Sequence, residues 1–248
     1  MSHYAKAWQA VTDRIATAAR DAGRPVAGVR LLAVSKTFPA EAVRAVHACG
    51  QRAFGENYVQ EAAAKRAALG DLTGIEWRLI GPLQSNKAAA AARLFDAVES
   101  VDDLRIARRL AAAREAAAPL PVLVQVNISG ESTKSGVRVD DALALAREVG
   151  RLPALALRGF MGIAAPGVDR DAQRGQFRAL KQCFDLARAD GLAVDTLSMG
   201  MSDDLELAVA EGSTEVRIGS ALFGTRRNTS LPAADASTRS PEGSGETS

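Results

Sequence analysis

The sequence alternates short apolar runs with longer stretches of helical periodicity along most of its 248 residues. Short apolar runs are typical of buried strands, and apolar residues spaced three or four apart are typical of amphipathic helices. The stretches that predict helices include residues 39–50, 102–118, 140–152 and 170–190. Such alternation favours an α/β protein with a parallel sheet. We predict eight strands, at residues 30–36, 52–56, 76–81, 96–100, 121–128, 156–163, 196–200 and 214–220.

Eight strands in a chain of this length favour a single closed (β/α)8 barrel, the TIM barrel, over a doubly wound open sheet. An open sheet rarely needs eight strands in about 220 ordered residues without an antiparallel edge. Residues 1–23 predict an additional amphipathic helix before the barrel. Residues 225–248 are rich in Ser, Thr, Pro and Gly, and we expect a disordered tail there. The expected organisation is therefore one barrel domain at residues 1–224, followed by this tail.

Charge and cysteine usage narrow the functional classes. The formal net charge of +2 is nearly balanced and mixed along the chain, so we expect no nucleic-acid partner. Residues 1–23 show neither the apolar core of a signal peptide nor a membrane span. Cys49 and Cys183 are isolated and match no zinc-site spacing, which indicates a reducing compartment, and we expect a cytoplasmic protein without a metal site. Because no large apolar stripe is left once the helices cover the barrel, we expect a monomer.

A lysine stands at the end of the first predicted strand. Lys36 closes the otherwise apolar run "RLLAVSK", and barrels carry their chemistry at the C-terminal ends of the strands. Closure pairs the last strand with the first, so Lys36 should face the end of residues 214–220. The loops at residues 198–204 and 217–224 combine glycine, which allows close backbone approach, with serine hydroxyls. We predict a phosphate site in these loops.

A lysine that faces a phosphate site across a barrel mouth fits pyridoxal 5'-phosphate (PLP). The aldehyde of PLP condenses with a lysine amine, and its phosphate is held by N–H groups and hydroxyls. Arg217, at the end of the last strand, is a candidate partner for the pyridine nitrogen. An arginine only donates and stays charged, so it would hold that nitrogen unprotonated and weaken the ring as an electron sink. Two other interpretations stay open: a structural ion pair at Arg217, and a different phosphorylated ligand with Lys36 as its charge partner.

Five strings in order between residues 33 and 224 carry a family resemblance: "AVSKT", "FGENYVQE", "GPLQSNK", "LSMGMSDD" and "VRIGSALFG". On these strings the chain resembles the PLP homeostasis protein family, whose barrel is similar to the N-terminal domain of alanine racemase. The sequence departs from that family's pattern at Arg78, where the family often has a histidine. The resemblance implies a Schiff base at Lys36, a pyridine-nitrogen contact from Arg217, a place beside the phenolic oxygen for Asn57, phosphate contacts from Ser198, Gly219 and Ser220, and membership of the same phosphate loop for Met199, Gly200 and Ser202.

The resemblance implies a PLP carrier that acts in vitamin B6 homeostasis by storing, buffering or delivering the cofactor. Its transient partners would be PLP-dependent apoenzymes or enzymes of vitamin B6 metabolism. The alternative is a single-domain PLP enzyme such as an amino-acid racemase, which needs two acid–base groups on opposite faces of the cofactor. Lys36 supplies one, and only Tyr4 and Tyr58 could supply a tyrosine. Residues 129–136 superficially resemble a P-loop, but Ser135 stands where the second glycine belongs, so we reject a nucleotide-binding interpretation.

Overall fold

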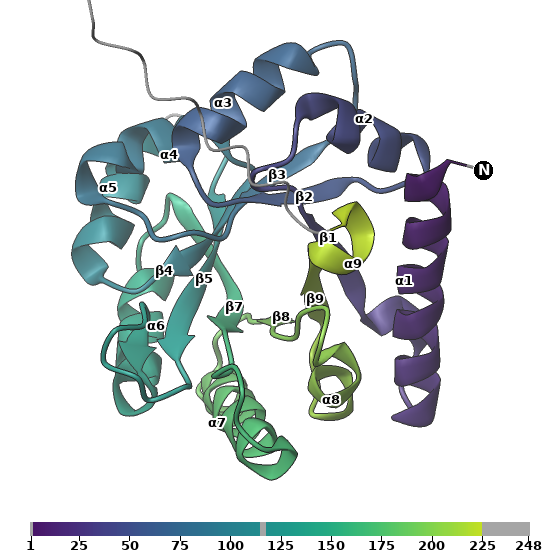
Figure 1. Ribbon diagram of the computed structural model, residues 1–248. Coiled ribbons are helices and arrows are strands. Elements are labelled where there is room, and N and C mark those ends of the chain that lie inside the picture. Colours follow the sequence, from purple (N-terminus) through teal and green to yellow (C-terminus); the bar gives the residue numbers. More distant parts are fainter. Residues whose placement is uncertain (1, 115–117, 225–248) are drawn as a thin grey trace, which may run out of the picture.

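The computed structural model describes residues 2–114 and 118–224, and it shows a ring of strands enclosed by helices (Figure 1). Each of the eight predicted runs overlaps an observed strand, so the predicted strand–helix alternation is confirmed. The predicted tail at residues 225–248 lies outside the described residues. The observed strands of the ring are β1 (Arg30–Val34), β2 (Ala53–Glu56), β3 (Glu76–Leu79), β4 (Ala97–Val101), β5 (Leu120–Asn127), β7 (Leu155–Gly162), β8 (Thr196–Ser198) and β9 (Glu215–Ile218).

The sheet closes on itself, which confirms the barrel. Its strands follow the order β4-β3-β2-β1-β9-β8-β7-β5, and a further pairing between β4 and β5 completes the ring. The recorded strand pairs are all parallel. In the β1–β9 pair, Leu32 lies opposite Arg217 and Ala33 opposite Ile218. The end of the last strand therefore lies beside the segment that carries Lys36, as predicted. A short additional strand, β6 (Val137–Arg138), pairs with β5 and was not predicted.

The helices cover the outside of the ring. The predicted N-terminal helix is confirmed as α1, which packs against α2, α8 and α9 (Figure 1). The predicted helical stretches 39–50 and 170–190 are observed as α2 and α7; Pro39 is the N-cap of α2, and the Asp169 carboxylate accepts hydrogen bonds at the start of α7. The helices are α1 (His3–Asp21), α2 (Ala40–Ala48), α3 (Val59–Ala68), α4 (Ala88–Leu94), α5 (Leu104–Arg114), α6 (Ala142–Gly150), α7 (Arg170–Ala189), α8 (Leu205–Ala210) and α9 (Ser220–Phe223), with short 3-10 turns at η1 (Val26–Gly28), η2 (Ser85–Lys87) and η3 (Val139–Asp141).

The strands separate an apolar outer core from a polar interior. Along β9, Val216 and Ile218 join the apolar core, while the alternate residues Glu215 and Arg217 are buried charges. Successive side chains of a strand point to opposite faces, so both charges lie on the inner face of the ring. Within residues 2–114 and 118–224, no helix is long and apolar enough to cross a membrane. The interior of this barrel therefore holds charged groups directly below the end where the site is expected.

Candidate functional site

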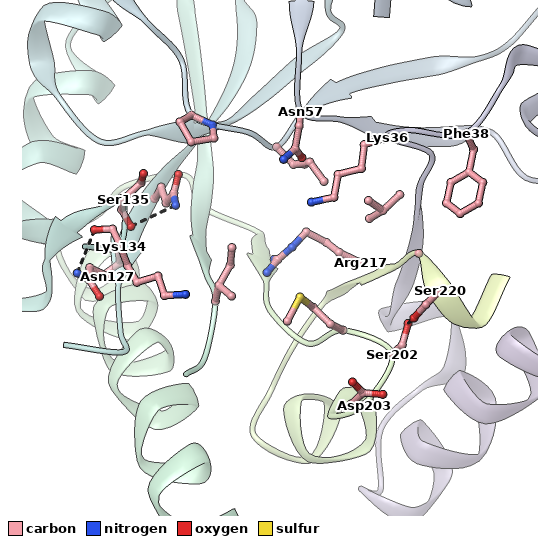
Figure 2. A pocket seen from close by; sticks show the side chains of 18 of the residues that line it. Lys36, Phe38, Asn57, Asn127, Lys134, Ser135, Ser202, Asp203, Arg217 and Ser220 are labelled. Atoms are coloured by element: carbon pink, nitrogen blue, oxygen red, sulfur yellow. Dashed lines mark hydrogen bonds between the residues drawn. The ribbon is translucent and has the colours of Figure 1, made fainter. Parts of the chain in front are cut away.

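A cavity of about 650 Å³ opens at the C-terminal ends of the strands. Its wall is formed by residues at the ends of β1, β5 and β9 and by residues that follow β1, β2, β3, β5, β7, β8 and β9. Figure 2 shows that the side chains of Lys36 and Arg217 both extend into this space, with Asn57 beside Lys36. The closed barrel thus brings together residues as far apart in the sequence as Val34 and Gly224, because every parallel strand ends at the same rim.

Lys36 enters the cavity two residues after β1 ends at Val34. The next residue, Thr37, has a φ of 68°, a left-handed conformation that β-branched residues rarely adopt. Asn57, which follows β2, lies in the same wall. Its backbone is approached by Gly81 after β3, where an added Cβ would lie 2.4 Å from the Asn57 carbonyl oxygen. A glycine is therefore required at position 81 for the two loops to pack this closely.

Arg217 forms part of the cavity floor and is only 4% exposed. One Nη of its guanidinium donates to the Ser198 hydroxyl at 2.8 Å, and the other donates to the Gly162 carbonyl at 2.8 Å. Burial lowers the pKa of Arg217 from its ordinary value, and the nearby carboxylates of Glu99 and Glu215 oppose that shift. An arginine starts from so high a pKa that the group stays charged at neutral pH. The floor of the cavity is thus a fixed cationic donor.

Three predicted site residues lie behind the cavity wall. Ser198 is fully buried, and its hydroxyl accepts from Arg217 and donates to Glu99 Oε2 at 2.7 Å. Met199 is fully buried in the apolar core. Gly200 has a φ of 97°, and its carbonyl accepts from the Arg217 amide at 2.9 Å. These residues hold Arg217 and turn the chain after β8, and their predicted contact with a phosphate stays a prediction.

The remaining predicted residues meet at one side of the cavity. Ser202, Gly219 and Ser220 all line its wall, the first after β8 and the other two after β9. The Ser220 hydroxyl donates to the Ser202 hydroxyl at 3.2 Å, and the Ala221 amide donates to the same oxygen at 3.4 Å. The hydroxyls of Ser202 and Ser220 (Figure 2) and the backbone N–H of Ala221 therefore gather in the place where a phosphate was predicted.

The sequence analysis considered residues 129–136 only as a P-loop and rejected that interpretation, and so missed that this loop after β5 forms the opposite wall. Thr133, Lys134 and Ser135 line the cavity, and Lys134 points toward it (Figure 2). The loop is held at its base, since the side-chain amide of Asn127 donates to the Glu131 carbonyl at 2.8 Å and the side-chain amide of Gln125 donates to the Ser135 carbonyl at 3.3 Å. The available signal was its position directly after a strand, because that position places any loop of a barrel at the rim.

Beneath the cavity, Arg78 anchors a buried ionic network that was also missed. Its guanidinium donates to Glu215 at 2.8 Å, approaches Glu99 at 3.3 Å and pairs with Glu76 at 2.7 Å. Burial and the neighbouring Glu99 raise the pKa of Glu215 to about 8, although Arg78 and Arg30 act in the opposite direction. Glu99 also accepts from Ser198, so the network continues to Arg217. Arg78 is thus the centre of the polar interior.

The fold and the site define a barrel of the alanine racemase N-terminal class. The profile of the family described as "Alanine racemase, N-terminal domain" matches residues 8–227. The chain is 54% identical over 228 residues to a Pseudomonas aeruginosa protein named pyridoxal phosphate homeostasis protein, which covers 91% of this chain and 97% of that relative. The chain belongs to the pyridoxal phosphate homeostasis protein family, so the resemblance inferred from the five strings is confirmed.

Two solved structures agree with this assignment. The crystal structure of a protein of unknown function from Bifidobacterium adolescentis has a TM-score of 0.84 and 38% identity, and covers 89% of this chain and 94% of that one. The structure of PipY from Synechococcus elongatus with PLP bound has a TM-score of 0.73 and 40% identity, and covers 79% of this chain and 93% of that one. The barrel of this chain is therefore similar to one that holds PLP in PipY.

Proposed function

We propose that this protein binds PLP as a Schiff base on Lys36 and serves PLP homeostasis by storing, buffering or delivering the cofactor. The observation that supports this proposal most strongly is that Lys36, Arg217 and the hydrogen-bonded hydroxyls of Ser202 and Ser220 line one cavity. The PLP-bound PipY structure and the name of the Pseudomonas aeruginosa relative support the choice of ligand. PLP-dependent apoenzymes are the proposed recipients.

The donors in the cavity fit PLP chemically. When bound, PLP supplies an aldehyde that a lysine amine can hold reversibly. Lys36, which lines the cavity after β1, would hold that aldehyde through its side-chain nitrogen. The hydroxyls of Ser202 and Ser220, with the amides beside Gly219, would hold the phosphate. Asn57 would lie beside the phenolic oxygen of the ring.

Arg217 separates binding from catalysis. Its guanidinium would donate to the pyridine nitrogen, and Ser198 and Gly162 fix its orientation. Because arginine does not give up its proton in proteins, that nitrogen stays unprotonated and draws little charge from a substrate's α-carbon. The same contact holds the ring in place. The site therefore favours a holder of PLP over a racemase.

A racemase would need a second acid–base group opposite Lys36. Tyr4 lies in α1 with its ring against Phe223, at a centroid distance of 6.3 Å. Tyr58 precedes α3 and is 59% exposed. Neither tyrosine is part of the cavity wall, and these are the only two in the sequence. The tyrosines are therefore excluded, but Lys134 and Asp203 also line the cavity, so the homeostasis name of the relative is the main support for a carrier over the racemase alternative.

Spectroscopic titration with PLP tests the proposal. The wild-type protein should turn yellow as the lysine Schiff base forms, and Lys36→Ala should not. Lys6→Ala, which removes an exposed lysine of α1, serves as the matched control and should behave as wild type. The same samples are assayed for racemisation of added amino acids, and we expect none. A yellow Lys36→Ala protein would contradict the assignment of the lysine, and rapid racemisation by the wild type would contradict the carrier function.

A further inference from the structure

Three charged side chains form a buried cluster behind the segment that carries Lys36. Lys65 of α3 is 5% exposed and Glu56 of β2 is fully buried, while Glu61 of α3 is partly exposed. The Lys65 ammonium donates to Glu56 Oε1 and to Glu61 Oε1, both at 2.7 Å. Its third hydrogen bond goes to the Ser35 carbonyl, also at 2.7 Å. We call Glu56, Glu61 and Lys65 the Lys65 cluster, and its ammonium has used all three of its donors.

The Lys65 cluster binds the residues on both sides of Lys36. Before the lysine, the Ser35 hydroxyl donates to Glu56 Oε1 at 2.6 Å, in addition to the bond between the Ser35 carbonyl and Lys65. After the lysine, the Thr37 amide donates to Glu61 Oε1 at 2.5 Å. Lys36 is therefore held between Ser35, which bonds to Glu56 and Lys65, and Thr37, which bonds to Glu61.

The backbone at Thr37 needs this restraint. Of the residues that the structure describes, Thr37 is the one non-glycine residue with a positive φ, at 68°. A β-branched residue adopts such a conformation only where its surroundings impose it. The bond from the Thr37 amide to Glu61 fixes the peptide plane between Lys36 and Thr37, next to the residue with the positive φ. The direction in which Lys36 leaves the strand thus depends on Glu61.

Stability gives no reason for charges at this place. Buried ion pairs lose most of their attraction to desolvation, and apolar side chains of similar size often serve the fold equally well. Glu56 illustrates the cost, since burial raises the pKa of its carboxyl against the opposing influence of Lys65. The other oxygen of the same carboxyl, Glu56 Oε2, is buried and has no hydrogen-bond partner among the described residues. What the cluster does achieve is a fixed backbone on either side of one lysine.

We propose that Glu61 and Lys65 are positioning residues that hold the Lys36 segment so that its amine enters the cavity. This inference rests on the proposed function, because positioning matters only if Lys36 bonds to a ligand. It also assigns a role to the "FGENYVQE" string, whose two glutamates are Glu56 and Glu61. Small errors in the placement of a reacting group lower rates strongly, so the cluster should act on the rate at which the amine captures an aldehyde.

The test compares Glu61→Leu with Glu61→Gln. Leucine removes the acceptor, whereas the glutamine oxygen still accepts from Thr37 and Lys65. The matched control is Asp185→Leu, which breaks the exposed Lys181–Asp185 pair of the same i,i+4 spacing in α7. Two quantities are measured: the rate of borohydride-trapped PLP incorporation at Lys36, and the hydrogen exchange of the Thr37 amide. The second needs no PLP.

We expect Glu61→Leu to slow capture by about ten- to a hundred-fold and to accelerate exchange at Thr37, while Glu61→Gln and Asp185→Leu stay near wild type. The double variant Thr37→Gly/Glu61→Leu should recover part of the rate, because glycine adopts positive φ without a restraint. This double variant also serves if Glu61→Leu alone folds poorly. Unfolding midpoints distinguish a positioning role from a purely structural one. A purely structural role would lower stability and leave the rate of PLP capture by the folded fraction unchanged.

Two outcomes overturn the inference and are distinguishable. If the wild type captures PLP at Lys36 and Glu61→Leu captures it equally fast, the positioning role is wrong and the proposed function stands. If the wild type captures no PLP at Lys36, the proposed function is wrong and the positioning role falls with it.

Discussion

Replacing Arg78 by methionine should destabilise the barrel far more than removing a surface arginine. The guanidinium contacts Glu215 at 2.8 Å and Glu99 at 3.3 Å, and both carboxylates are at most 1% exposed. Methionine keeps much of the side-chain volume but leaves Glu99 without this cation and leaves Glu215 with only the half-exposed Arg30, at 3.4 Å. Removing one partner of a buried ion pair costs about 3–5 kcal/mol, since the remaining charge is buried and uncompensated.

Urea unfolding measures this cost as a change in the free energy of unfolding. The control is Arg147→Met, which breaks a bidentate pair with Asp190 whose side chains are 47% and 33% exposed. Exposed pairs contribute roughly 0–1 kcal/mol, so the control should change little. The double variant Arg78→Met/Glu215→Met should regain much of the loss, because an apolar pair of similar size replaces the ionic one. A loss below about 1 kcal/mol for Arg78→Met would refute the reasoning.

Three further predictions concern the network and the cavity. The pKa of Glu215 is raised to about 8 in the folded protein, so the native state keeps a proton that the unfolded chain loses, and stability should fall as pH rises from about 5 to about 8 and level off above. Glu215→Gln should flatten this slope in unfolding measurements across that range. An unchanged slope would contradict the assignment of the raised pKa to Glu215. Arg217→Glu, if it folds and binds PLP, should protonate the ring nitrogen and raise α-proton exchange of added amino acids in deuterated water, whereas equal exchange in both proteins would remove the proposed role of Arg217. Pyridoxal, which lacks the phosphate, should bind far more weakly than PLP because several charge-assisted hydrogen bonds of roughly 1.5–3 kcal/mol each are lost. Ser202→Ala or Ser220→Ala should weaken PLP binding only in part. Equal affinity for pyridoxal and PLP would rule out the phosphate site.

The barrel could be predicted because its signals are local. Each strand carries its own apolar run, and the count of eight runs with helices between them leaves few architectures. The pairing of Lys36 with Arg217 at one rim followed from closure, since parallel strands of a ring all end on the same side. The short strand β6 was not predicted because its two residues are too few to show an alternation of apolar and polar side chains. The number of strands in the ring and the end of the barrel that carries the site could thus be predicted from the sequence.

The polar interior could not be predicted from local patterns. Alternation along β9 indicates that Glu215 and Arg217 share a face, but their partners lie on other strands. Arg78 and Glu215 are 137 positions apart, and whether they meet depends on side-chain length and on the width of the ring. The same holds for Ser198, which the structure turns toward Arg217 and Glu99 behind the cavity wall. Contacts between strands that are not neighbours need coordinates.

The central claim is that Lys36 holds PLP covalently, and borohydride reduction followed by peptide mass mapping tests it most directly. Reduction turns the imine into a stable secondary amine, so the mass of the added pyridoxyl group marks the lysine that carried it. We predict the added mass on the peptide that contains Lys36, with the exposed control Lys6 unmodified. An adduct found mainly on another lysine, or no adduct after incubation with PLP, would contradict the proposed function.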